Sequence, residues 1–298
     1  MDNAEINIGD ELIPPTIDEI TIRDRRVFIV REFNEEIWNL FILRTKQLIS
    51  AYLDCEFYAS EVHLLQISFG EDSEIFIFFP HKDKKLRDHL SQALSAYSKN
   101  VYLWGCNFDL CHMYTDLDIK IKNPYDVIDC VPKRVPRNLE AFIKYSNKYI
   151  EPFYGSTKKA FGETFSRDVL SRRNYWDEIT YSKIEYSALD CIYVEQAKEI
   201  FKYECKPFPK DKVYKNVTSA TLSNYSKYLP KKTAPTNLRG SSNLLSFYDS
   251  YQLLLQKHKA QVIQWTQKHK ATVIHINTMM KELSSTYPVF HDLHIPLL

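Results

Sequence analysis

The chain has 298 residues, of which 44% are hydrophobic, and a formal net charge of +1. This length and composition suffice for a sizeable buried core and exclude a disordered or fibrous protein. The sequence begins with an acidic stretch and has no run approaching about 18 uncharged apolar residues. We therefore expect an intracellular protein, cytoplasmic or nuclear, with no membrane partner.

Charge is divided unevenly along the chain. Residues 206–298 contain 13 Lys and Arg against 4 Asp and Glu, a net of +9, whereas residues 1–205 contain 26 and 34, a net of −8. A basic tail of this kind is often only solvated, but it can also attract a polyanion.

The six cysteines are scattered without a C-x-x-C pair, so we expect reduced, mostly buried thiols. Cys106, Cys111 and His112 offer soft metal ligands, but no second cluster at zinc-like spacing completes a four-ligand site.

Hydrophobic periodicity predicts a series of strands and helices in the first two thirds of the chain. Strands are predicted at 27–30, 47–57, 63–69, 74–79, 100–104 and 128–131, and helices at 34–46, 84–96, from Asp109, at 138–150 and at 181–203. Short turns join the second, third and fourth strands into an antiparallel meander. Strands followed by alternating helices and strands predict an α/β sandwich with a mixed sheet.

The last third of the chain has a different character. Residues 206–243 are rich in Pro, Lys, Ser, Thr and Asn, which predicts a linker or extended arm. Residues 244–298 show a seven-residue hydrophobic repeat, which predicts a long amphipathic helix that packs on the body or forms a coiled coil with a protein partner or a second copy. We therefore expect four segments: 1–24 acidic, 25–205 a body, 206–243 a basic arm and 244–298 a helix and tail.

Two carboxylates, Asp54 and Glu56, stand one residue apart in the strand predicted over 47–57. Since side chains alternate across a strand, both point to the same face. Ionised carboxylates side by side on a largely apolar strand repel each other and lose hydration, which is costly without a cation or a hydrogen-bond network. A divalent metal ion is the simplest compensation.

Three further polar residues occupy suggestive positions. Asp109 follows a predicted strand at the start of a helix, where a carboxylate commonly acts as a cap. Tyr186 and Asp190 are four residues apart on a predicted helix and share one face, as an ordinary hydrogen-bonded pair also would.

In their order and contexts, these fragments resemble the motifs of the DEDDy family of 3′ to 5′ exonucleases, the ribonuclease D and Werner-type group. LDCEF at 53–57 resembles the first motif, an Asp-x-Glu strand, GCNFDL at 105–110 resembles the second, and YSALD at 186–190 resembles the third, Tyr-x-x-x-Asp on a helix. HLLQIS at 63–68 resembles the second strand of that family. The resemblance covers about residues 25–205, and its departures, Cys55 and the Gly105-Cys106 pair, remove no ligand.

The resemblance implies a ribonuclease H-like fold, a mixed central sheet flanked by helices, and hydrolysis with two divalent cations. It implies that Asp54, Glu56, Asp109 and Asp190 hold the ions, and that the Tyr186 hydroxyl orients the attacking water. An all-carboxylate site suits Mg²⁺ or Mn²⁺. Two such ions activate water and stabilise charge on a departing 3′ oxygen. An unperturbed phenol has a pKa of about 10, so Tyr186 is expected to position water rather than act as a strong base.

The expected products are nucleoside 5′-monophosphates released from the 3′ end of a single strand, RNA ahead of DNA. Phe57 and Asn107 are candidate contacts for the terminal nucleotide. An aromatic ring such as that of Phe57 can stack on any base, because stacking is indifferent to base sequence. Core packing is the competing interpretation of Phe57.

Two other functions remain open at this point. The chain could be an RNA-binding adaptor that uses an exonuclease fold without turnover and recruits a protein through its tail. Alternatively, Asp54 and Glu56 could be structural and form ion pairs with Arg or Lys across the sheet.

Overall fold

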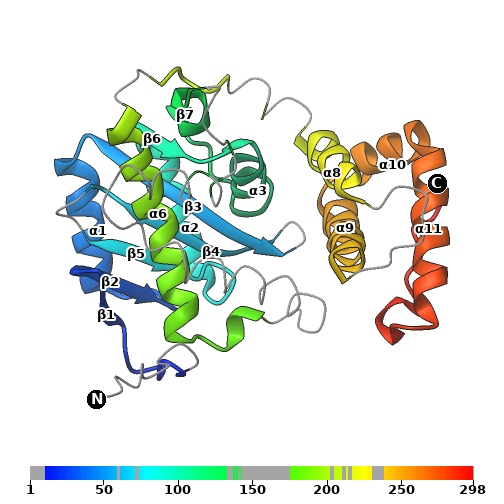
Figure 1. Cartoon of the computed structure of the whole chain (residues 1–298), viewed down its shortest axis with the longest axis horizontal. Helices are drawn as coiled ribbons and strands as arrows, with labels where there is room; N and C mark the ends of the chain where they lie inside the picture. Colours follow the sequence, from blue (N-terminus) through cyan, green and yellow to red (C-terminus); the bar gives the residue numbers. More distant parts are fainter. Residues whose placement is uncertain are drawn as a thin grey trace, which may run out of the picture.

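The computed structural model describes a mixed α/β body and a group of C-terminal helices (Figure 1). The described residues are 11–58, 61–70, 74–132, 137, 139, 142, 175–201, 205–209, 213, 217–229 and 238–297.

A seven-stranded sheet forms the centre of the body, in the order β1-β2-β5-β4-β3-β6-β7. The strands are β1 Glu19–Ile22, β2 Arg25–Val30, β3 Ser50–Tyr58, β4 Glu61–Ser68, β5 Ile75–Phe78, β6 Asn100–Leu103 and β7 Pro124–Asp126. β4 pairs antiparallel with both β3 and β5, whereas β6 is parallel to β3 and β7 is parallel to β6. The mixed sheet confirms the predicted α/β class, and strands β3 to β7 have the order and directions of a ribonuclease H-like sheet.

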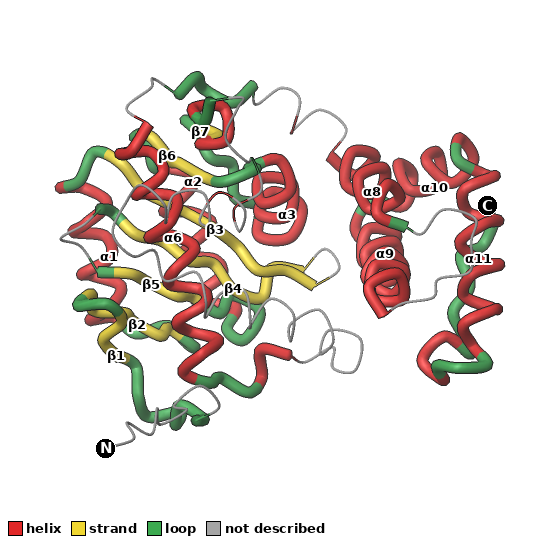
Figure 2. The backbone as a smooth tube through the Cα atoms, in the orientation of Figure 1, coloured by secondary structure: helices red, strands yellow, loops and turns green. Residues whose placement is uncertain are grey.

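Helices cover both faces of this sheet (Figure 2). The helices of the body are α1 Glu35–Gln47, α2 Lys84–Ala96, α3 Asn107–Leu117 and α6 Tyr181–Phe201, with short 3-10 turns η2 Val127–Cys130 and η3 Tyr175–Asp177. The C-terminal helices are α8 Val217–Tyr228, α9 Leu238–Lys257, α10 Lys259–Lys268 and α11 Lys270–Ser284, followed by the turn η4 Pro288–Phe290.

Alternation along β3 assigns its side chains to two separate cores. Leu53 and Cys55 belong to a buried cluster that includes residues of α1, α2 and α3. Tyr52, one position earlier, belongs to the cluster beneath α6. Even-numbered residues of this part of β3 therefore face α6, and odd-numbered ones face the opposite layer.

Most predicted elements of the body are confirmed within a few residues, including the antiparallel meander and the helices that became α1, α2 and α6. The strand predicted over 128–131 is wrong, because the Asp126 carboxylate accepts a hydrogen bond from Ile128 N at 3.0 Å and begins the 3-10 turn η2. The predicted helix over 138–150 lies for the most part outside the described residues.

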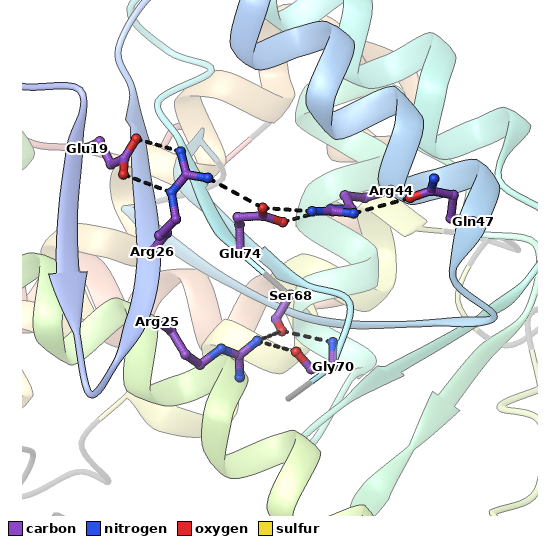
Figure 3. A network of polar contacts seen from close by, with 8 residues as sticks. All are labelled: Glu19, Arg25, Arg26, Arg44, Gln47, Ser68, Gly70 and Glu74. Carbon is purple, nitrogen blue, oxygen red and sulfur yellow. Dashed lines mark hydrogen bonds and ion pairs between the residues drawn. The ribbon is translucent and has the colours of Figure 1, made fainter. Parts of the chain in front are cut away.

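The N-terminal segment contains a strand that the sequence analysis missed. In β1 only Ile22 is buried, so the strand has no alternating pattern to detect. β1 pairs antiparallel with β2 at the edge of the sheet, and the Glu19 carboxylate binds Arg26 on β2 (Figure 3). Arg26 also approaches Glu74, which forms a bidentate pair with Arg44 of α1 at 2.8 Å for each bond.

The C-terminal third differs from both predictions made for it. Residues 206–243, predicted to be a linker or arm, contain α8 and the start of α9. The single long helix predicted over 244–298 is instead divided at His258 and His269, whose backbone angles are not helical. The three resulting helices fold back on one another and share a core around Tyr251, Trp265 and Ile276. Among the described helices, none is long and apolar enough to cross a membrane.

The prediction of reduced thiols is correct for four cysteines and wrong for two. Cys55, Cys106, Cys111 and Cys191 are free and buried. Cys130 and Cys205 form a disulfide that joins η2 to the segment after α6. These two cysteines are 75 residues apart in sequence, so no local spacing pattern predicts that they pair.

Candidate metal centre

Asp54 and Glu56 lie on the face of β3 that is turned toward α6. β4 runs beside them, and its residues directly opposite Asp54 and Glu56 are Gln66 and Leu64. Neither of these neighbours is basic, so the sheet supplies no cross-strand cation to Asp54 or Glu56 from β4. The residues directly opposite on β4 therefore do not provide the cross-strand ion pair that the structural interpretation expects.

The third carboxylate comes from the helix that crosses this face. Asp190 on α6 is buried, 4% exposed, and one ligand oxygen from each of Asp54, Glu56 and Asp190 lies within 4.8 Å of the others. Tyr186 is half-buried one helical turn before Asp190, so it lies on the same side of α6. Residues more than 130 positions apart in sequence thus converge on one point.

Three carboxylates this close together require a positive charge, because like charges in a partly buried setting repel strongly. Among the described residues, this is the group of three or more potential ligand side chains that could hold a metal ion. Its donors are all hard oxygen atoms, and such donors fit Mg²⁺ or Mn²⁺. Cys106, Cys111 and His112 do not form a second group of this kind.

Asp109 stands outside this group of three. It is the third residue of α3, is 7% exposed, and its Oδ1 accepts a hydrogen bond from the Cys55 thiol with an Sγ–Oδ1 distance of 3.3 Å. Burial raises the pKa of Asp109 well above its usual range, and the negative charge of Asp54 raises this pKa further. Asp109 is also not the N-cap of α3, since Cys106 holds that position.

The turn that delivers Asp109 is organised by Asp126 on β7. The Asp126 carboxylate accepts hydrogen bonds from Gly105 N at 2.9 Å and from Cys106 N at 3.2 Å. Gly105 has φ +71°, a left-handed conformation that favours glycine. Burial raises the pKa of Asp126, and these amide hydrogen bonds oppose the shift.

The two candidate substrate contacts have different surroundings. The Phe57 ring stacks on His112 of α3 with centroids 3.8 Å apart, and it also packs against the core of the C-terminal helices. His112 Nε2 is in turn 3.3 Å from the Tyr225 hydroxyl of α8. Asn107 is the first residue of α3 and is half-buried, two residues before Asp109.

Several solved structures are similar to this chain at low sequence identity. An RNase D from Trypanosoma brucei is 14% identical, with 74% of this chain and 81% of that chain covered and a TM-score of 0.45. NrnC from Brucella melitensis with bound Mg²⁺ is 15% identical, with 72% and 90% covered and a TM-score of 0.35. The Nibbler EXO domain from Aedes aegypti is 8% identical, with 64% and 94% covered and a TM-score of 0.37. No protein-family model and no curated protein matches the chain.

Sequence reasoning missed the roles of three residues that contact or adjoin the candidate site residues Asp54 and Asp109 or the turn before α3. Asp126 was not singled out, Cys55 was noted only as a departure from a motif, and Gln66 only as part of the HLLQIS segment. For Gln66 a signal was present, because a polar residue opposite Asp54 interrupts the apolar run of β4. The contact of Cys55 with Asp109 joins residues 54 positions apart and had no such signal.

Proposed function

We propose that this chain is a metal-dependent 3′ to 5′ exonuclease whose catalytic domain spans residues 25–205. The observation that supports this most strongly is the convergence of Asp54, Glu56 and Asp190 within 4.8 Å, with Tyr186 one turn away on the same helix. The motif resemblance, which rests on the sequence alone, assigns the same residues to phosphodiester hydrolysis.

In this proposal the carboxylates of Asp54, Glu56 and Asp190 hold divalent cations, and Asp109 completes the set of four. Mg²⁺ or Mn²⁺ held by these carboxylates would supply water activation and stabilise charge on the departing 3′ oxygen. The Tyr186 hydroxyl orients the attacking water by hydrogen bonding. The thiol of Cys55 and the turn held by Asp126 fix where Asp109 enters the site.

The proposed substrate is a single-stranded 3′ end, RNA ahead of DNA, with nucleoside 5′-monophosphates as products. Asn107, beside the start of α3, remains a candidate contact for the terminal nucleotide. The stacking of Phe57 on His112 supports a packing role for that ring, so its contact with a base is the weaker part of the proposal.

The test uses a 5′-labelled single strand incubated with the purified chain and Mg²⁺ or Mn²⁺. Wild type should shorten the strand one nucleotide at a time, and Asp54→Ala and Asp190→Ala should each reduce the rate at least about 1,000-fold by removing a charge that the site needs. Asp88→Ala, which removes an exposed carboxylate from α2, is the matched control and should cleave like wild type.

Equal inertness of wild type and both site variants on RNA and DNA, with either metal, would refute catalysis. If such an inert chain still bound single-stranded RNA, the adaptor function would replace it. Matched RNA and DNA oligonucleotides assayed side by side decide the sugar preference, since the 2′-hydroxyl is the difference that a protein can read.

A further inference from the structure

The face of β4 beneath α6 carries one amide in an otherwise apolar setting. Gln66 is 0% exposed, and its neighbours in register are Asp54 on β3 and Ile77 on β5. Ile77 and Leu64, two residues before Gln66, belong to the buried cluster that packs against α6. The Gln66 side chain therefore lies between the sheet and the helix that brings Asp190.

Neither polar atom of this amide is satisfied. Among the described residues, no hydrogen-bond partner lies within reach of Gln66 Nε2 or of Oε1. A buried amide with both atoms unpaired is rare, because it loses its hydrogen bonds to water without replacement. Apolar residues of similar size would fill the same space without this cost.

Ser68, the next polar residue on the same face of β4, does have hydrogen-bond partners. Ser68, two residues after Gln66, receives a hydrogen bond from Arg25 Nη2 at 2.5 Å, and the same guanidinium nitrogen donates to Gly70 O (Figure 3). Arg25 also pairs with Glu195 of α6 at 2.9 Å. Ser68 therefore has polar partners, whereas Gln66, two residues before it on the same strand, has none among the described residues.

The position of Gln66 fits one member of that cluster. Directly opposed residues in an antiparallel pair have Cβ atoms about 5 Å apart and point to the same face. A glutamine side chain is long enough to bring its terminal NH₂ group to the carboxylate of an opposed aspartate. The residue directly opposed to Gln66 on β3 is Asp54.

We propose that Gln66 is a positioning residue of the metal centre, and that its amide NH₂ donates a hydrogen bond to the Asp54 carboxylate when the site holds divalent cations. This inference rests on the proposed function. The hydrogen bond fixes the orientation in which Asp54 presents its oxygen atoms. Partners of this kind, which orient a ligand without touching the metal, typically change metal affinity 10- to 100-fold when they are lost.

Mn²⁺ binding measured by isothermal titration calorimetry on the full chain tests this without any assay of cleavage. Gln66→Met keeps the length and volume of the side chain but removes the amide. We expect its Kd for Mn²⁺ to rise about 10-fold or more, while its melting temperature without metal stays the same or increases. Thr266→Val is the matched control, because Thr266 on α10 also has a buried hydroxyl without a partner among the described residues. Its Kd should equal that of wild type.

A Kd for Gln66→Met within twofold of wild type would overturn the proposal and leave the metal centre standing. Absence of Mn²⁺ binding by wild type would overturn both this inference and the proposed function. Should Gln66→Met fail to fold, the side-chain amide signal of Gln66 in wild type, followed by NMR during Mg²⁺ titration, decides the matter. A shift of that signal supports the hydrogen bond, and an unmoved signal overturns it.

Discussion

At the scale of single residues, Cys55 has a role that its place between two acids did not suggest. Alternation along β3 directs Asp54 and Glu56 to one face and the Cys55 side chain away from them. The Cys55 thiol donates a hydrogen bond to Asp109. Burial raises the pKa of this thiol well above its usual range, and the charge of Asp109 raises the same pKa further. Cys55 therefore stays protonated and remains a hydrogen-bond donor.

Replacing this donor should destabilise the fold. In Cys55→Ala the buried Asp109 loses its partner, and we expect the free energy of unfolding to fall by about 1 to 3 kcal/mol. Cys55→Ser retains a donor and should lose less. Urea denaturation at pH 7 measures the difference, and equal stability of the alanine variant and wild type would show that the thiol bond contributes nothing.

At the scale of elements, the entry into α3 depends on Asp126. Its carboxylate binds the amides of Gly105, Cys106 and Ile128, so it joins β7 to the turn that carries Asp109. Asp126→Ala leaves these amides without their acceptor and should cost about 3 kcal/mol. Asp126→Asn keeps one acceptor oxygen, so its free energy of unfolding should lie between those of Asp126→Ala and wild type. If denaturant unfolding gives Asp126→Ala and Asp126→Asn the same free energy of unfolding, the hydrogen bonds from the amides do not stabilise the turn.

The loop after β5 should make stability sensitive to acid. Burial, followed by the charge of the neighbouring His63, lowers the pKa of His81 from 6.5 to about 4. The unfolded chain then binds a proton near pH 6.5 that the folded chain accepts only near pH 4. Stability from His81 is complete above pH 6.5, falls between pH 6.5 and 4, and falls no further below pH 4.

Full burial would make this loss about 3 kcal/mol, and solvent screening at the partly exposed ring reduces it. His81→Gln should therefore gain stability relative to wild type as the pH falls from 7 to 4.5. His291→Gln, at an exposed position, serves as the control for replacing a histidine by glutamine. Parallel curves for wild type and His81→Gln, measured by urea unfolding at each pH, would contradict the assigned shift.

These elements also show where sequence patterns succeed and where they fail. β3, β4 and β5 are found because their apolar runs are bounded by turns, and alternation along the strand places Asp54 and Glu56 on one face. Asp190 is joined to them by the motif resemblance, since helical spacing relates it only to Tyr186. The break at His258 is not found, because the heptad pattern continues across it while the backbone leaves the helical region. Cys130 and Cys205 are brought together only by the tertiary fold, so no local sequence pattern predicts their disulfide.

At the scale of the whole molecule, the C-terminal helices are attached to the body through α3 and the end of β3. α8 packs against α3, and the Phe57, His112 and Tyr225 rings form a continuous contact from β3 to α8. Lys257 at the end of α9 binds Asp116 Oδ1 at 3.0 Å. The described helices of the basic C-terminal part are therefore attached to the acidic body by both apolar and charged contacts.

Because of this attachment, removing the C-terminal helices should destabilise the body. A chain ending at residue 205 loses Val213, which is part of the core of the body, and Tyr225, which covers His112. We expect this truncated chain to melt several degrees lower than the full chain and to bind the dye ANS, because it exposes apolar surface that the helices cover. Calorimetry and dye fluorescence provide the two measurements.

Lys257→Ala is the matched variant for this experiment, because it removes the ion pair and leaves the apolar contacts in place. Asp116 keeps its bond from Arg87 and accepts Val62 N at 2.8 Å, so the loss should be at most about 1 kcal/mol. If Lys257→Ala lowered the melting temperature strongly and truncation lowered it only slightly, charge rather than apolar burial would attach the helices to the body. Identical melting of the truncated and full chains would show that the body is stable without the helices that cover His112.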